Sequence, residues 1–215
     1  MLMRSAIDKD NWYLLPTENL EPFDYLLSII AYHSAPALES EKPAVLLTFS
    51  NEGTRRLNRL WLQNRERVPQ SAHFRFFELR RTPKQTTVLF YHPASLQKVL
   101  WEDTNAGYLR SCGYREELTL ETALSDLKAR CQRGCPHEIG IFLGIPLPDV
   151  LGFIENRGKN ALAGGYWKIY HDPVPKLALF ARYQEAKRDF IRFISAGNGA
   201  EEYLLRIRHP DSSER

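Results

Sequence analysis

The sequence predicts an α+β fold, in which helices pack on a small mixed sheet and the C-terminal half is the more helical one. Apolar residues repeat at helical spacing in many segments, and short runs of β-branched and aromatic residues occur between them, mainly in the first half. No linker rich in glycine or serine divides the 215 residues. We therefore expect a single domain over residues 1–215, with loose termini at about 1–20 and 210–215.

The first half is expected to run helix, strand, helix, strand, strand, helix. Pro22 suits a first helical turn, and the apolar residues after it recur at helical spacing as far as His33. A short apolar run from Ala44 suits a buried strand, and Arg81 to Gln85 suits a hairpin loop. The expected helices cover residues 22–33, 52–67 and 93–101, and the expected strands 44–49, 73–80 and 86–91.

Glycines mark several helix ends in the second half. Gly113 and Gly134 each follow a helical pattern, and Gly197 follows a long one that Asp172 and Pro173 open. The expected helices cover residues 105–112, 119–133, 136–143, 147–156 and 173–196, and the expected strands 166–171 and 203–207.

Composition excludes several classes of protein. Hydrophobic residues make up 43% of the chain and charged ones 26%, which is typical of a globular protein and excludes a disordered or collagen-like one. No apolar run approaches the ~20 residues that cross a bilayer, and the N-terminus has no secretory signal pattern. We expect a cytoplasmic protein with no membrane partner, whose three cysteines are reduced thiols rather than a disulfide framework.

The net charge of +3 conceals an uneven distribution. Residues 51–100 hold ten Lys or Arg against three Glu, so this window carries +7 and the rest of the chain −4. A basic patch at Arg55, Arg56 and Arg59 could receive an anionic cofactor or an acidic partner protein. The alternative is a solvated charged face, which is what charge runs usually form.

His137 and Glu138 are the candidate catalytic residues. Histidine exchanges protons near neutral pH, and a carboxylate beside it can tune its pKa. Adjacent residues on a helix do not face the same way, so the two cannot form one bidentate site in a regular helix. In the alternative interpretation, His137 caps the helix after Pro136 and Glu138 favours the positive end of that helix.

His33 and Lys42 are candidate ligand-binding residues. They flank an irregular loop that contains Pro36, and Lys42 directly precedes an expected strand. A basic pair at such a position can hold a carboxylate or a phosphate. The alternative is that His33 bonds the last carbonyl groups of its helix.

The segment Gly-Gly-Tyr-Trp-Lys-Ile-Tyr supplies three more candidate ligand-binding residues. Strand alternation puts Tyr166, Lys168 and Tyr170 on one face, where they can line a pocket beside the flexible glycines. It puts Trp167 and Ile169 on the other face, toward the core.

Known cofactor and metal motifs are missing from the sequence. It has no P-loop, no G-x-G-x-x-G and no G-x-S-x-G pattern, so no cofactor is identified. Cys131, Cys135 and His137 do not have zinc-ligand spacing, and no metal site is expected. Residues 138–156 are compatible with a helix-turn-helix, but Asp149 would repel phosphate, so nucleic acid is not an expected partner.

Specific motifs run through the chain. Pro-His-Glu-Ile-Gly at 136–140 and Gly-Tyr-Trp-Lys at 165–168, together with residues 33–38, resemble a bacterial family classified as a domain of unknown function and found mainly in anaerobic Firmicutes. The chain departs from the family pattern at Ile145, where an aromatic residue is usual, and at Cys135, where an apolar one is usual. The resemblance implies a cytosolic single-domain protein with no established reaction.

Three functions are compatible with these residues. The favoured one is binding of an anionic small molecule or cofactor in a pocket shared by the candidate residues. In an enzyme, His137 would be the acid or base and Lys42 would hold an anionic group. The second is a non-enzymatic interaction or accessory protein for a redox or metal-handling partner, and the least favoured is a helix-turn-helix DNA binder. The pocket of the first function would bring together His33, Lys42, His137, Glu138, Lys168 and Tyr170.

Overall fold

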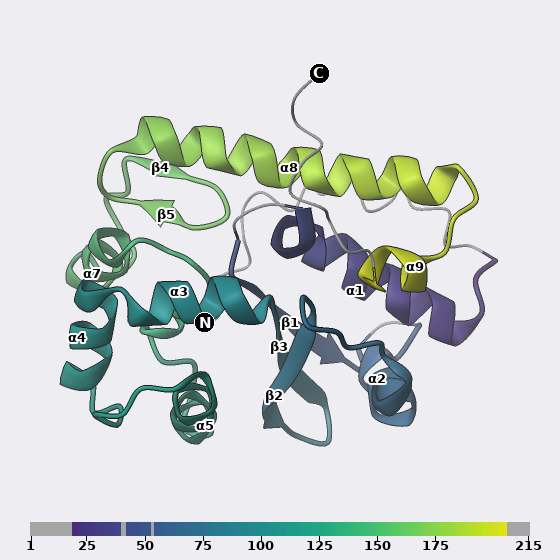
Figure 1. Cartoon of the computed structure of the whole chain (residues 1–215), viewed down its shortest axis with the longest axis horizontal. Coiled ribbons are helices and arrows are strands. Elements are labelled where there is room, and N and C mark those ends of the chain that lie inside the picture. Colours follow the sequence, from purple (N-terminus) through teal and green to yellow (C-terminus); the bar gives the residue numbers. More distant parts are fainter. Residues whose placement is uncertain (1–18, 40–41, 53, 206–215) are drawn as a thin grey trace.

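A computed structural model describes residues 19–39, 42–52 and 54–205. Within these residues, helices cover both faces of a three-stranded antiparallel sheet, and the C-terminal half is helical apart from one short hairpin (Figure 1). The predicted α+β class is therefore confirmed. The termini that we expected to be loose fall outside the described residues, apart from residues 19 and 20.

The helices and strands follow the expected order over most of the chain. In the first half they are α1 (Pro22–Glu39), β1 (Ala44–Ser50), α2 (Leu57–Asn64), the 3₁₀ turn η2 (Arg65–Arg67), β2 (Arg75–Arg81), β3 (Gln85–Tyr91) and α3 (Pro93–Trp101). In the second half they are α4 (Asp103–Ser111), α5 (Leu120–Cys131), α6 (Ile139–Phe142), α7 (Leu147–Glu155), β4 (Ala163–Gly164), β5 (Lys168–Ile169), α8 (Pro173–Ser195) and α9 (Ala200–Leu205).

The sheet has the order β1-β3-β2, and both strand pairs are antiparallel rather than mixed as expected. The crossover through α2 makes β1 and β2 run in the same direction, which alone would give a parallel pair. The short loop after β2 reverses the chain, however, and β3 inserts between the two strands. Each of them therefore pairs with a strand of opposite direction.

Strand alternation divides the core between the two faces of the sheet. Val45 and Phe90 point to the face covered by α1 and α2, and α8 and α9 pack on α1. Leu89 and Tyr91 point to the opposite face, which packs against the helices from α3 to α7. The sheet therefore separates two apolar cores.

Helix α1 continues six residues beyond the expected end at His33. Pro36 lies inside it, although an internal proline costs a helix about 3 kcal/mol. Ser34, Ala35, Pro36 and Ala37 are all buried, and α1 packs on both α8 and α9. Tertiary packing therefore outweighs the local signal for a break.

The expected strand at 203–207 was wrong over residues 203–205, because residues 200–205 form α9, and residues 206–207 lie outside the described residues. Its buried residues, Ala200, Tyr203 and Leu204, recur at helical spacing and pack on α1. The expected strand at 166–171 is reduced to the two residues of β5, which pair with β4.

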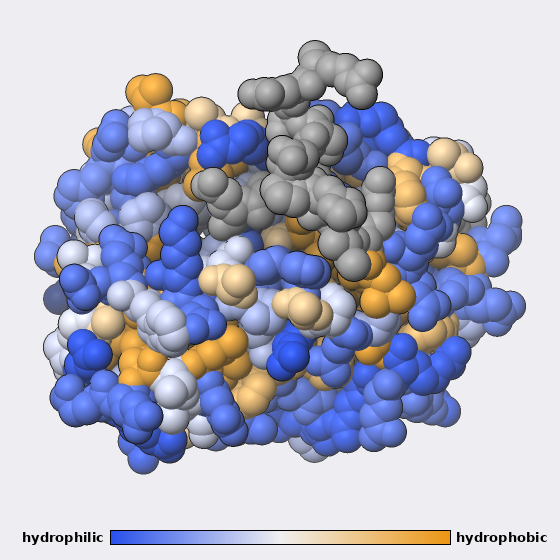
Figure 2. All heavy atoms as spheres, in the orientation of Figure 1, coloured by the Kyte–Doolittle hydropathy of each residue, from blue (hydrophilic) through white to orange (hydrophobic). Residues whose placement is uncertain are grey.

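No helix in the described ranges is long and apolar enough to span a bilayer. On the face shown in Figure 2, hydrophilic side chains predominate, and hydrophobic ones form small separate groups.

Gly152 allows α7 to pack closely on Tyr170. A Cβ added at Gly152 would lie 2.6 Å from both Cβ and Cγ of Tyr170. We expect Gly152→Ala to lower the free energy of unfolding by about 1–3 kcal/mol, because neither helix nor ring can yield without repacking. Urea denaturation of both proteins measures the difference.

Gly107 provides the matched control for this substitution. It lies within α4, is exposed, and a Cβ added there would meet no atom within 4 Å. Gly107→Ala should therefore raise the free energy of unfolding by about 0.5–1 kcal/mol, since alanine loses less backbone entropy on folding. Equal effects of the two substitutions would contradict the close packing at Gly152.

Candidate functional site

Two lysines are buried at one place in the fold. Lys42 lies just before β1 and Lys187 lies in α8, and they are only 6% and 5% exposed. Lysine is rarely buried, because taking an ammonium out of water costs several kcal/mol unless other groups replace the water. This pair is therefore the clearest candidate for a functional site in the described part of the chain.

Aromatic rings surround the two amines. The Nζ atom of Lys42 lies 5.8 Å from the ring centroid of Tyr166, and that of Lys187 lies 5.4 Å from the same centroid. The other rings lie 4.9–6.0 Å from one amine or the other. Such faces attract a cation by about 0.5–2 kcal/mol each. We call this cluster the lysine box; it comprises Lys42, Lys187, Tyr32, Tyr166, Trp167 and Tyr183.

The main chain holds Lys42 in place. Its Nζ donates a hydrogen bond to the carbonyl oxygen of Leu143, at 3.0 Å. The next residue, Pro43, lies against Gly144, where an added Cβ would be 2.5 Å from Cδ of Pro43. Gly144 also has φ +75°, which favours glycine. The turn between α6 and α7 is therefore shaped to receive the segment that carries Lys42.

The amine of Lys42 is easily deprotonated. Burial lowers its pKa from 10.5 to about 7, and the positive charge of Lys187 adds to the lowering. No carboxylate among the described residues counteracts these two effects. At neutral pH the amine is therefore present in both its charged and its neutral form.

Asp149 fixes the hairpin that forms one wall of the lysine box. Its buried carboxylate accepts hydrogen bonds from Nε1 of Trp167 at 2.9 Å and from the backbone N–H groups of Tyr170 and His171 at 2.8 and 3.1 Å. The Nζ of Lys176 lies 3.2 Å from its Oδ2. One side chain of α7 thus joins β5 to the start of α8.

Two of the candidate ligand-binding residues predicted from the sequence, Lys42 and Tyr166, lie in the lysine box, and a third, His33, lies beside it. His33 is half-buried in α1, and its ring contacts Tyr32 edge-on, with 5.2 Å between centroids. Because α1 continues past it, His33 is not at the helix end where we expected it.

The two candidate catalytic residues lie elsewhere and point apart. His137 is exposed, and its ring centroid is 5.6 Å from that of Phe153. Glu138 is buried and accepts a hydrogen bond from Arg130 at 3.4 Å. No hydrogen bond, ion pair or ring contact between described residues joins His137 to His33.

The other two candidates contribute to local structure. Lys168 is exposed, and its Nζ donates to the carbonyl oxygen of Gly158. Tyr170 is buried against Gly152, whereas alternation predicted that it would share a face with Lys168. Trp167 and Ile169 are buried in the core as expected.

The cysteines are free thiols. Burial raises the pKa of Cys131 to about 12 and also raises that of Cys135, so both are protonated at neutral pH and are weak nucleophiles. In the described ranges, no group of three or more His, Cys, Asp or Glu residues is placed to hold a metal ion.

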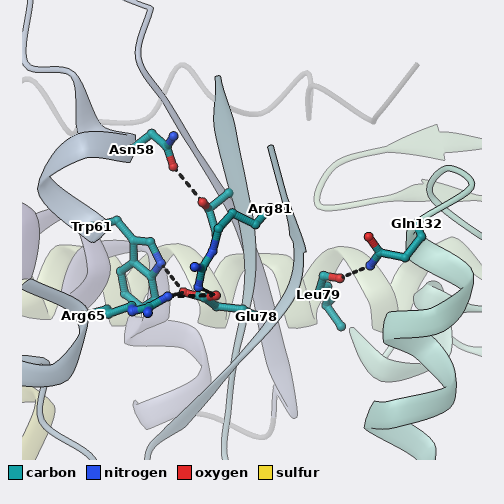
Figure 3. Close-up of polar contacts among 8 residues, drawn as sticks. Asn58, Trp61, Arg65, Glu78, Leu79, Arg81 and Gln132 are labelled. Atoms are coloured by element: carbon teal, nitrogen blue, oxygen red, sulfur yellow. Dashed lines mark hydrogen bonds and ion pairs between the residues drawn. The ribbon is translucent and has the colours of Figure 1, made fainter. Parts of the chain in front are cut away.

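Several arginines of the positively charged window, residues 51–100, form hydrogen bonds and ion pairs that stabilise the fold. Glu78 accepts hydrogen bonds from Nε1 of Trp61 at 2.8 Å and from Arg65 at 3.0 Å, and it also pairs with Arg81 (Figure 3). Residues three apart in a regular strand face opposite ways, but a β-bulge after Glu78 brings Arg81 to the same face. The carbonyl oxygen of Leu79, in this bulge, accepts a hydrogen bond from Gln132 at 2.7 Å.

The basic patch itself lies at the start of α2. The guanidinium of Arg55 lies 4.5 Å from the ring centroid of Tyr25. Arg56 and Arg59 are exposed, and neither forms an ion pair with a described residue. Shallow surface hollows occur near this end of the molecule, beside Phe23 and Arg67 and beside Thr82 and Lys84, but none of the lysine-box residues lines them.

Sequence reasoning missed Lys187, although a signal was present. The buried residues Phe180, Tyr183 and Phe190 mark the inner face of α8 at helical spacing, and Lys187 occupies the same face. A lysine at a position where the pattern requires an apolar residue indicates a buried charge.

A family model described as "Protein of unknown function (DUF3793)" matches residues 30–204, a range that includes the whole lysine box. Neither the curated proteins nor the solved structures include a significant match to the chain.

Proposed function

We propose a function on the premise that the chain belongs to the family described as protein of unknown function (DUF3793). The proposal is that the protein binds a small anionic molecule at the lysine box, through Lys42 and Lys187. The observation that carries it is the burial of two amines around the ring of Tyr166.

Electrostatics support an anionic ligand. The charge of Lys187 disfavours the charge of Lys42, and the described partners of Lys42 are three ring faces and one carbonyl oxygen. An anion near both amines would offset their repulsion and stabilise the protonated form of Lys42. Charge-assisted hydrogen bonds to such an anion are about twice as strong as neutral ones.

The proposed site differs from the one expected from the sequence. It keeps Lys42 and Tyr166, with His33 beside it, and adds Lys187. His137, Glu138, Lys168 and Tyr170 are not part of it, because their contacts lie with other groups.

Sulfate is a suitable probe, because its charge does not change between pH 6 and pH 9. We expect calorimetric titration to show binding at pH 6 that weakens at least tenfold at pH 9, as Lys42 loses its proton. Lys42→Met should weaken binding at pH 6 by at least tenfold. Lys128→Met is the matched control, since Lys128 also lies over a ring, that of Phe77, but is exposed.

A second candidate is an accessory function, in which the basic patch receives an acidic partner protein. Exposed Arg56 and Arg59, without ion pairs among the described residues, support it. The same titration separates the two candidates. The double variant Arg56→Glu, Arg59→Glu should retain sulfate affinity. Loss of binding in this variant and retention in Lys42→Met would contradict the lysine-box proposal.

A further inference from the structure

We infer that Lys42 is a nucleophile that forms an imine with a carbonyl compound carrying an anionic group, of which a 2-oxo acid is the simplest class. This inference rests on the proposed anion site and names the chemistry of its ligand.

Lys42 has the features that a nucleophilic amine requires. A neutral amine has two N–H groups and one lone pair, and the hydrogen bond to Leu143 uses one N–H group, which leaves the lone pair available. The neutral form is well populated at pH 7, where an ordinary lysine is neutral in about one molecule in a thousand or fewer. Desolvation and a neighbouring cation are the two known means of activating a lysine, and both act here.

Lys187 supplies the second half of the recognition. It lies on the same ring, that of Tyr166, as Lys42, but is held by a different element, α8. A carboxylate bound by Lys187 would bring the carbonyl carbon next to it toward Lys42. The ligand must therefore carry its anionic group close to its carbonyl group, as a 2-oxo acid does.

The surroundings favour the complete reaction. The Nζ of Lys42 attacks the carbonyl carbon, and a proton passes from nitrogen to oxygen to give a carbinolamine. The C–O bond then breaks, the oxygen leaves as water, and a C=N bond remains, so that one carbonyl and one amine give one imine and one water. The rings of Trp167 and Tyr183 keep the amine away from bulk solvent, which disfavours the reverse hydrolysis.

Tyr166 marks the path by which a ligand would enter. It is the one member of the lysine box that is half-buried, whereas the other five are buried. Its ring centroid lies within 6 Å of both amines, and it belongs to a hairpin with only two strand pairs, a length that has little stability of its own. A ligand that displaced this side chain from Phe180 and Tyr183 would reach both amines.

Reductive trapping tests the inference on the full chain. The protein is incubated at pH 7 with glyoxylate and cyanoborohydride, which converts an imine to a stable carboxymethyl-lysine, and peptide mapping locates the modified residues. We expect at least tenfold higher modification of Lys42 than of Lys128, no adduct at position 42 in Lys42→Arg, and protection of Lys42 by sulfate. The wild-type map alone is informative even where a variant does not fold.

The outcomes separate this inference from the proposed function. If all lysines are modified to the same extent and sulfate binding still depends on Lys42, the imine proposal is overturned and the anion site stands. Selective modification of Lys42 that sulfate does not prevent supports the nucleophile and contradicts the anion site. Absence of both the adduct at Lys42 and sulfate binding overturns both.

Discussion

Replacing Lys42 by methionine is expected to make the protein more stable at neutral pH. Lowering the pKa of a lysine from 10.5 to about 7 corresponds to about 5 kcal/mol, at about 1.4 kcal/mol for each tenfold change in proton affinity. Methionine fills similar space, but it loses the ring contacts and leaves the carbonyl group of Leu143 without its donor. We expect a net gain of about 2–4 kcal/mol in the free energy of unfolding.

The gain should depend on pH in a defined direction. Below pH 7 Lys42 is protonated in both the folded and the unfolded protein, so the full cost of burying its charge is present. Between pH 7 and about 10.5 the unfolded state binds more protons than the folded state, and the wild type gains about 1.4 kcal/mol for each pH unit. The advantage of Lys42→Met should therefore shrink over this range.

Urea denaturation at pH 6, 7 and 9, without multivalent anions, measures both effects. Lys128→Met, in which an exposed lysine is replaced, should stay within about 0.5 kcal/mol of the wild type at each pH. Two results would contradict the expected cost of burying Lys42. One is a Lys42→Met variant that is less stable than the wild type at pH 6, and the other is a gain in stability of the same size at every pH.

Replacing Asp149 by alanine should have an effect of similar size and opposite sign. We expect a loss of about 3–5 kcal/mol, because the substitution leaves several buried donors without an acceptor and Lys176 without its ion pair. Asp149→Asn keeps one carbonyl oxygen and should lose about 2 kcal/mol. Denaturant unfolding followed by tryptophan fluorescence measures the loss of stability in both variants.

Glu155 provides the control for Asp149. It lies on the same helix, α7, but is exposed, so Glu155→Ala should change stability by less than about 0.5 kcal/mol. If Asp149→Ala were as mild as this control, the carboxylate would not be what joins the hairpin to α8.

Local pattern predicted most of the elements. Helix α3 begins and ends where the Pro93 signal and the apolar spacing placed it, and the ends of β1, β2 and β3 differ from expectation by at most two residues. Prediction failed where packing overrides local preference. The Ser-Ala-Pro sequence after His33 signals a break, but that turn is buried in a helix that packs on α8 and α9, and α1 stays helical.

The candidate site was less accessible to sequence reasoning. Lys42 was found because it and His33 flank a loop before an expected strand, and Tyr166 because strand alternation placed it on a face beside two glycines. His137 and Glu138 drew attention as a pair, but adjacent residues of one turn diverge, and one reaches solvent while the other reaches Arg130. Which of these residues meet depends on contacts between α8 and the β4–β5 hairpin, and no local pattern encodes them.

The lysine box draws its side chains from two stretches of the chain that are distant in sequence. Residues 32–42 belong to α1 and the segment before β1, and residues 166–187 belong to the β4–β5 hairpin and α8. No fragment shorter than residues 32–187 contains all of them, so a ligand would have nothing to recognise in a partly folded chain. Its binding energy then acts entirely on the native state. At a ligand concentration one hundred times the Kd, this would add about 2.7 kcal/mol to the resistance of the whole protein to unfolding. Occupancy in the cell would thereby protect the protein from proteolysis, and its abundance would follow the supply of its ligand.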